Sequence, residues 1–138
     1  MEADRYDLYP IGRVESTLTD CELAPRQGDE GAPEAWVAFD PSVGAGLHDL
    51  QVGTSVILLT WLDRARRDVL EVHPRGDPDR PRLGVFSTRS ADRPNPIGLH
   101  IVLIVAIDGT RMRVRDLEAL DGTPVLDVKP VLEARGQR

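Results

Sequence analysis

Short apolar runs separated by glycine and proline constrain the fold of this chain more than any other feature. Nowhere in its 138 residues does apolar spacing indicate an amphipathic helix longer than two turns. One helical turn is expected around Leu47 to Leu50. Many short strands with frequent turn residues are typical of a barrel or a sandwich, so an all-β fold is expected. The expected strands cover residues 6–14, 35–39, 54–62, 68–73, 83–88, 97–107, 111–117 and 125–128.

The strongest strand pattern lies in the second half of the chain. Residues 97–107 form a nearly continuous apolar run, and residues 111–117 alternate between polar and apolar side chains. Asp108 and Gly109 lie between them, and this pair is typical of a tight turn. We therefore expect residues 97–117 to form an antiparallel hairpin.

Composition bounds the class of protein. Hydrophobic residues make up 41% of the chain, enough for one packed core, and we expect a single domain over residues 1–138. No apolar run approaches the ~18 residues of a membrane helix, and the N-terminus has no apolar signal stretch. Cys21 is the only cysteine, so no internal disulfide can form. These features predict a cytoplasmic protein that does not enter the membrane.

The charge balance argues against a general nucleic-acid binder, because the formal net charge is -6 and such proteins are usually basic. Sixteen of the seventeen cationic residues are nevertheless arginine, and Lys129 is the only lysine. Arginine favours two-point contacts with carboxylate and phosphate groups, so a local basic patch is compatible with the acidic balance. His48, His73 and His100 are far apart in the sequence and show no metal-ligand spacing, so no metal is expected.

The densest group of polar residues is the segment GVFSTRSADRPNPIGL at residues 84–99. Pro94 and Pro96 remove two backbone donors and restrict φ, so this loop is expected to be stiff. A stiff loop that carries Arg89, Arg93 and Asn95 is suited to presenting binding groups from a β scaffold. The simpler alternative, a proline-rich turn with solvated arginines, has equal weight on physical grounds alone.

A second segment, DGTPVLDVKP, covers residues 121–130. If residues 125–128 are extended, Asp127 and Lys129 lie on the same face of the strand, because side chains alternate with period two. The alternative is an ordinary surface ion pair, which is common and weak. A third group, Pro25-Arg26-Gln27, lies in a long loop at residues 16–33 and says little by itself.

Together these segments resemble, in the same order, the motifs of the TrmO (TsaA-like) family. Residues 84–99 are similar to its pattern G-V-F-A-T-R-S-P-x-R-P-N-P-I-G-L, and residues 121–130 to its D-G-T-P-V-L-D-I-K-P. Ile11-Gly12 and the group at residues 25–27 fit its N-terminal elements, so the resemblance spans residues 6–132. Ala91 and His100 replace the usual proline and serine.

The resemblance implies a small antiparallel β-barrel that binds S-adenosylmethionine and forms homodimers, with the cofactor near the subunit interface. It also implies methylation of N6 of threonylcarbamoyladenosine beside the tRNA anticodon. Longer members carry a C-terminal domain that helps to grip tRNA, and this chain is expected to lack it.

The chemistry of the cofactor then assigns roles to the side chains. Arginines can hold its carboxylate, whereas amides and a hydroxyl can contact its polar edges and apolar side chains its adenine or methionine part. The candidates for cofactor binding are Arg26, Gln27, Phe86, Thr88, Arg89, Arg93, Asn95 and Leu126.

N6 beside a carbamoyl group is a weak nucleophile, so a base near it would help to remove its proton. Asp127, held by Lys129, is the first candidate, and His100 and Asp121 are the next. Catalysis by proximity alone, with solvent accepting the proton, is the alternative.

Two other functions stay open. The net charge of -6 and the expected absence of a tRNA-gripping domain favour a small-molecule methyltransferase on the same barrel, whereas the motifs favour tRNA. A non-catalytic module that binds S-adenosylmethionine is the third alternative.

Overall fold

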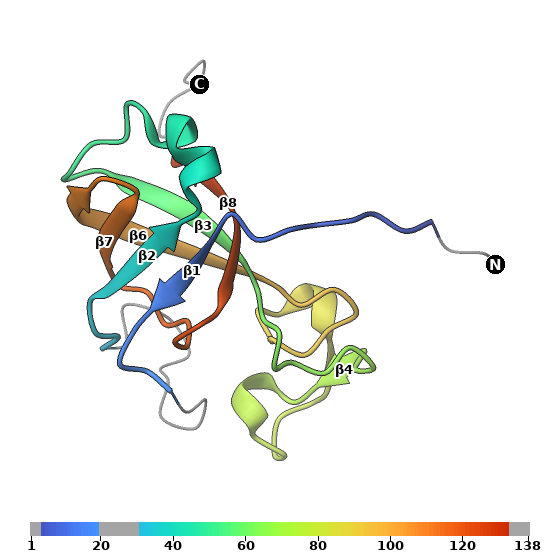
Figure 1. Ribbon diagram of the computed structural model, residues 1–138. Coiled ribbons are helices and arrows are strands. Elements are labelled where there is room, and N and C mark those ends of the chain that lie inside the picture. Colours follow the sequence, from blue (N-terminus) through green and yellow to red (C-terminus); the bar gives the residue numbers. More distant parts are fainter. Residues whose placement is uncertain (1–3, 20–30, 133–138) are drawn as a thin grey trace.

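A computed structural model describes residues 4–19 and 31–132 of the chain. Six antiparallel strands pair in the order β1-β2-β7-β6-β3-β8 and close into a barrel (Figure 1). The mostly-β class expected from the sequence is confirmed. The barrel strands are β1 (Gly12–Glu15), β2 (Ala35–Phe39), β3 (Ser55–Trp61), β6 (Ile97–Asp108), β7 (Arg111–Arg115) and β8 (Pro124–Pro130).

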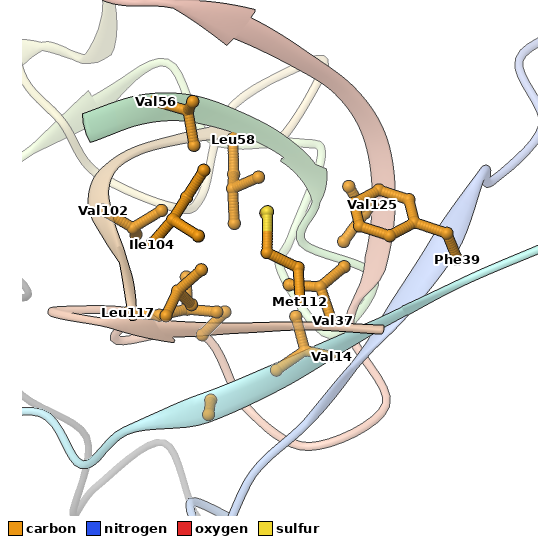
Figure 2. Packing of buried hydrophobic residues seen from close by; sticks show 13 residues of the cluster. Val14, Val37, Phe39, Val56, Leu58, Val102, Ile104, Met112, Leu117 and Val125 are labelled. Atoms are coloured by element: carbon orange, nitrogen blue, oxygen red, sulfur yellow. The ribbon is translucent and has the colours of Figure 1, made fainter. Parts of the chain in front are cut away.

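One row of side chains from each barrel strand points inward, because successive residues of a strand face opposite sides of the sheet. Figure 2 shows these apolar side chains, from all six strands, filling a common interior. Leu58, Ile104 and Met112 are among the largest that are fully buried. Each such side chain contributes about 1.5–3 kcal/mol relative to an exposed one, so this interior holds the barrel together.

The expected hairpin of residues 97–117 is confirmed. β6 and β7 pair antiparallel from Asp108 opposite Arg111 to Leu103 opposite Arg115. Gly109 has φ 61° in the connection, a conformation that glycine adopts without a steric penalty. β7 ends at Arg115, two residues earlier than expected, and Asp116 there has φ 73°.

A lobe of residues 62–96 projects from one end of the barrel (Figure 1). It leaves β3 after Trp61 and returns at Ile97, and these two residues are directly opposite each other in the sheet. The lobe contains a two-stranded ribbon, β4 (Glu71–Val72) with β5 (Leu83–Gly84), and two short 3-10 turns. The turns are η3 (Pro74–Gly76) and η4 (Val85–Ser87). Most of the motif segment at residues 84–99 therefore lies in the lobe.

Three local expectations were wrong. Of residues 6–14, only those from Gly12 onward pair as a strand; residues 4–10 form an extended, exposed arm (Figure 1). The helical turn expected at residues 47–50 is the 3-10 helix η2 (Pro41–Leu47), which begins earlier because Asp40 caps it. The strand expected at residues 83–88 ends at Gly84 and continues as η4. No helix within the described ranges is long and apolar enough to cross a membrane.

Candidate functional site

Arg93 shapes the first half of the signature loop. Its Nη2 donates to the backbone carbonyl of Thr88 at 2.9 Å and also to that of Val85, so one guanidinium nitrogen closes η4. Its Nε is buried, and no residue that the structure describes provides it with an acceptor. A buried donor without a partner is rare in folded proteins and commonly indicates a missing water or ligand.

Arg67 holds the second half of the loop. Its Nε donates to the carbonyl of Pro94 at 2.7 Å, and its Nη2 donates to Oδ1 of Asn95 at 2.9 Å. Its guanidinium also lies over the ring of Trp61, 5.2 Å from the ring centroid. Sequence reasoning missed Arg67, because its partners lie 27 and 28 positions away and no local pattern connects them.

A third set of contacts ties the two ends of the lobe together. The backbone N–H of Arg66 donates to Asp92 Oδ1 at 2.8 Å, and the N–H of Arg93 donates to the carbonyl of Arg66 at 3.0 Å. Two hydrogen bonds from the Arg66 guanidinium lower the pKa of Asp68 from its usual value, and the pKa of Arg66 is raised in return. Because this ion pair is exposed, it contributes little to stability and mainly orients the two side chains.

The remaining candidates in the lobe differ in how available they are. Arg89 is exposed and makes no hydrogen bond or ion pair with the described part of the chain, and Phe86 is 81% exposed. The hydroxyl of Thr88 donates to the carbonyl of Val85 and accepts from the N–H of Ser90, so it serves the loop itself. Arg26 and Gln27 lie outside the described residues.

On β8, Asp127 and Lys129 lie side by side, as the period-two spacing predicts. The Lys129 Nζ is 3.4 Å from Asp127 Oδ2, and both side chains are about half exposed. Next to them the register of β3 and β8 shifts, so that Leu126 has no partner on β3. A bulge of this kind redirects the side chains around it, and such bulges are frequent beside binding sites.

The two motif segments, residues 84–99 and residues 121–130, come close together on the outer surface of the barrel. Leu59 of β3 is opposite Leu99 of β6 on one side and opposite Asp127 of β8 on the other. Neighbouring strands are about 4.8 Å apart, so Asp127 lies roughly 10 Å from Leu99. The outward surface of β3 and β6, next to β8 in the sheet, is apolar and consists of Ile57, Leu59, Trp61, Ile97, Leu99 and Ile101, which we call the β3–β6 face.

The two weaker base candidates are both engaged in contacts of the fold, His100 inside it and Asp121 at its surface. His100 is 5% exposed; its Nε2 is 2.7 Å from the hydroxyl of Thr60 and its Nδ1 is 2.5 Å from Glu118 Oε1. To act as a base, His100 would first have to give up one of these contacts. Asp121 accepts a hydrogen bond from the backbone N–H of Ser16 at 3.0 Å. A separate hollow of about 330 Å³ at β1 and β2 is lined by none of the candidate residues.

The sequence that forms this barrel and its arginine-proline-asparagine loop matches the N-terminal domain of a tRNA methyltransferase family. The family model that matches residues 13–135 is that of the tRNA-methyltransferase O N-terminal domain, and the chain belongs to this family. The resemblance to TrmO (TsaA-like) proteins is thereby confirmed.

Relatives and solved structures agree with this assignment. The chain is 43% identical over 122 residues to an S-adenosyl-L-methionine-binding protein of Archaeoglobus fulgidus, covering 88% of this chain and 86% of the relative. It is 41% identical over 126 residues to a probable S-adenosyl-L-methionine-binding protein of Methanothermobacter thermautotrophicus, covering 91% and 90%. A crystal structure of TrmO from Pseudomonas aeruginosa matches with a TM-score of 0.75 and 27% identity, over 98% of this chain and 62% of that chain. The chain therefore spans less than two thirds of the solved TrmO.

Proposed function

We propose that this protein is an S-adenosylmethionine-dependent methyltransferase that methylates N6 of threonylcarbamoyladenosine in tRNA. Family membership supports the reaction class, and the names of the archaeal relatives support the cofactor. When bound, S-adenosylmethionine supplies an electrophilic methyl group on a sulfonium. The protein then has to position that group, exclude water and accept a proton.

The observation that carries the proposal is the buried Nε of Arg93 in the loop of residues 84–99, which has no hydrogen-bond partner among the residues that the structure describes. A carboxylate is the acceptor that such a donor favours, and charge-assisted bonds to it are strong. Arg89, which makes no hydrogen bond or ion pair with the described residues, can add a second cation, and the exposed ring of Phe86 can cover an adenine. The lobe thus fits a ligand that has both a carboxylate and a flat apolar ring.

Asp127 is proposed as the base. Methylation of N6 forms a C–N bond while the C–S bond of the sulfonium breaks and its electron pair leaves with S-adenosylhomocysteine; the N–H bond of N6 also breaks, and the proton passes to a carboxylate oxygen of Asp127. Lys129, 3.4 Å from that carboxylate, orients it or holds the threonyl carboxylate of the acceptor. Both groups lie on β8 beside the β3–β6 face, and the bulge at Leu126 directly precedes Asp127.

The test is methyl transfer to tRNA that carries threonylcarbamoyladenosine, followed by mass spectrometry of the nucleosides. Asp127→Asn should lower turnover by about 10²-fold or more while the affinity for S-adenosylmethionine is unchanged. Asp108→Asn, an exposed aspartate at the end of β6, is the control and should have wild-type turnover.

Each other outcome assigns the protein differently. If Asp127→Asn does not change turnover, Asp127 is excluded as the base, and catalysis by proximity is the explanation that is left. Cofactor binding without methylation of any tRNA would exclude the proposed acceptor and favour a small molecule, as the net charge of -6 does, or a non-catalytic module. A purified chain without affinity for S-adenosylmethionine would overturn the whole proposal.

We also propose that two copies associate through the β3–β6 face. Ile97, Leu99 and Ile101 are 42%, 39% and 57% exposed on adjacent positions of one outward row. Contiguous exposed apolar side chains commonly mark an interaction surface.

A further inference from the structure

Positive charge in this acidic chain is concentrated in the lobe. Residues 62–96 contain eight of the seventeen cationic residues but only six of the twenty-three acidic ones, so the lobe has a formal charge of +2 in a chain of -6. Figure 1 shows the lobe projecting from one end of the barrel, away from the more acidic remainder. A separate basic module on an acidic protein points to an anionic partner at that end.

Some arginines of the lobe are occupied by the fold and others are not. Arg66, Arg67 and Arg93 bond within the lobe, and Arg64 donates to the carbonyl of Thr19 at 3.2 Å. By contrast, the guanidinium groups of three exposed residues make no hydrogen bond, ion pair or ring contact with the residues that the structure describes. These three residues are Arg80, Arg82 and Arg89.

The backbone that presents Arg80 is fixed on both sides. Its N–H donates to the carbonyl of Asp77 at 3.1 Å, and its carbonyl accepts from Nδ1 of His73 at 2.8 Å. The Asp77 side chain accepts from the N–H of Asp79 at 2.9 Å, and Pro81 restricts the chain directly after Arg80. A side chain on a rigid loop loses less entropy when it binds than one on a mobile loop, so this arrangement favours binding.

Position relates these arginines to the site. Arg82 leads through the two residues of β5 directly into η4, which carries Phe86, and Arg89 follows η4. Two unpaired guanidinium groups therefore flank, along the chain, the turn assigned to the cofactor. Arginine binds phosphate by paired, charge-assisted hydrogen bonds, and several such contacts in a row suit a backbone with repeated phosphates.

We infer that Arg80 and Arg82 form an RNA-binding surface, which holds the phosphates of the single-stranded loop that contains the methyl acceptor. The inference rests on the proposed function and narrows it, because a neutral small-molecule acceptor leaves these two cations without a ligand. Single-stranded loops are the usual targets of specific RNA recognition, since their bases can leave the stack and enter a site.

The experiment measures the affinity for a labelled RNA stem-loop with an anticodon-arm sequence over a series of salt concentrations. Arg80→Gln/Arg82→Gln should weaken binding at low salt about tenfold or more. It should also reduce the slope of log K against log salt by about 1.4–1.8, the value for two lost phosphate contacts. The matched control is Arg111→Gln/Arg113→Gln, which removes the same charge from β7, where the arginines pair with Glu15 and Glu34.

Binding of S-adenosylmethionine and the thermal unfolding midpoint are measured for each variant and should not change with Arg80→Gln/Arg82→Gln. If both double variants lose the same RNA affinity, the loss depends only on net charge and not on the position of the arginines, and the inference is overturned. Wild-type affinity in the lobe variant, equal binding of polyglutamate, or a parallel loss of cofactor affinity would overturn it as well. RNA binding that follows this pattern without methyl transfer would instead count against the proposed function alone.

Discussion

Gly98 leaves the space that two buried polar side chains of the barrel, Thr60 and His100, need in order to contact each other. A Cβ there would lie 2.4 Å from Thr60 Oγ1 and 2.8 Å from His100 Nε2. The buried chain of contacts from Thr60 through His100 to Glu118 is therefore possible only because position 98 is glycine. Since Thr60 and His100 are buried, each polar atom in this chain of contacts depends on its partner.

Gly98→Ala should destabilise the protein by about 1–3 kcal/mol, because the new methyl group overlaps buried atoms that cannot move freely. Urea denaturation measures the change. Gly46→Ala is the matched control: nothing lies within 4 Å of the Cβ it adds, so stability should change little or rise slightly. Equal stability of the Gly98 variant and the wild type would show that Thr60 and His100 are not packed as described.

His100 also shows what the sequence contained but local reasoning did not use. It lies two and four positions before Val102 and Ile104 on β6, and both of these side chains are buried. Because side chains alternate between the two faces of a strand, His100 also points to the inside. Its chemistry made it a base candidate, whereas its position in the strand predicts a structural contact. By the same rule, the placement of Asp127 and Lys129 on one face of the strand was correctly predicted.

At the scale of elements, a strand was predictable where side-chain alternation in the sequence coincides with a neighbouring strand that pairs with it. Ala35–Phe39 and the β6–β7 hairpin follow from alternation and a glycine turn, which are local properties. Residues 6–10 have strand-forming side chains but pair with no described strand, and a strand requires a partner for its backbone groups. The turn η4 replaces the expected strand after Gly84 because Arg93, eight residues beyond Val85, captures its carbonyl.

Asp40 provides an element-scale prediction, since it caps η2. The N–H of Ser42 donates to its carboxylate at 2.9 Å, and this bond lowers the pKa of Asp40 from its usual value of 3.8. A lowered pKa in the folded state means that the unfolded chain binds the proton more readily. The stabilisation is therefore complete above pH 3.8 and is lost as the pH falls through the lowered pKa.

Asp40→Ala should lower the urea midpoint at neutral pH, and the difference from wild type should shrink as the pH falls below 3.8. Asp40→Asn keeps an acceptor for Ser42 but cannot titrate. The difference between the alanine and asparagine variants should therefore stay constant over the same pH series. A wild-type advantage that persists in acid would exclude the carboxylate as its source.

On the scale of the whole molecule, the barrel contains the apolar core and the lobe carries most of the proposed binding groups. The core is complete without residues 62–96, since every member of its buried cluster lies outside the lobe. The contacts that shape the lobe are instead hydrogen bonds between arginines and the backbone, formed by residues far apart in the sequence. This division explains why apolar patterning predicted the fold more completely than it predicted the site.

The β3–β6 face is the part of the barrel that this division leaves unexplained, because its outward side chains are apolar and border both Asp127 and the root of the lobe. If two copies cover it, Ile101→Asp places a carboxylate in an apolar interface at a substantial desolvation cost, so the variant should be monomeric in sedimentation equilibrium. Val52→Asp is a closely matched control, since Val52 and Ile101 are both 57% exposed but Val52 lies outside this face. A dimer that survives Ile101→Asp, or a wild-type chain that is monomeric at every concentration, would assign the face to a different partner.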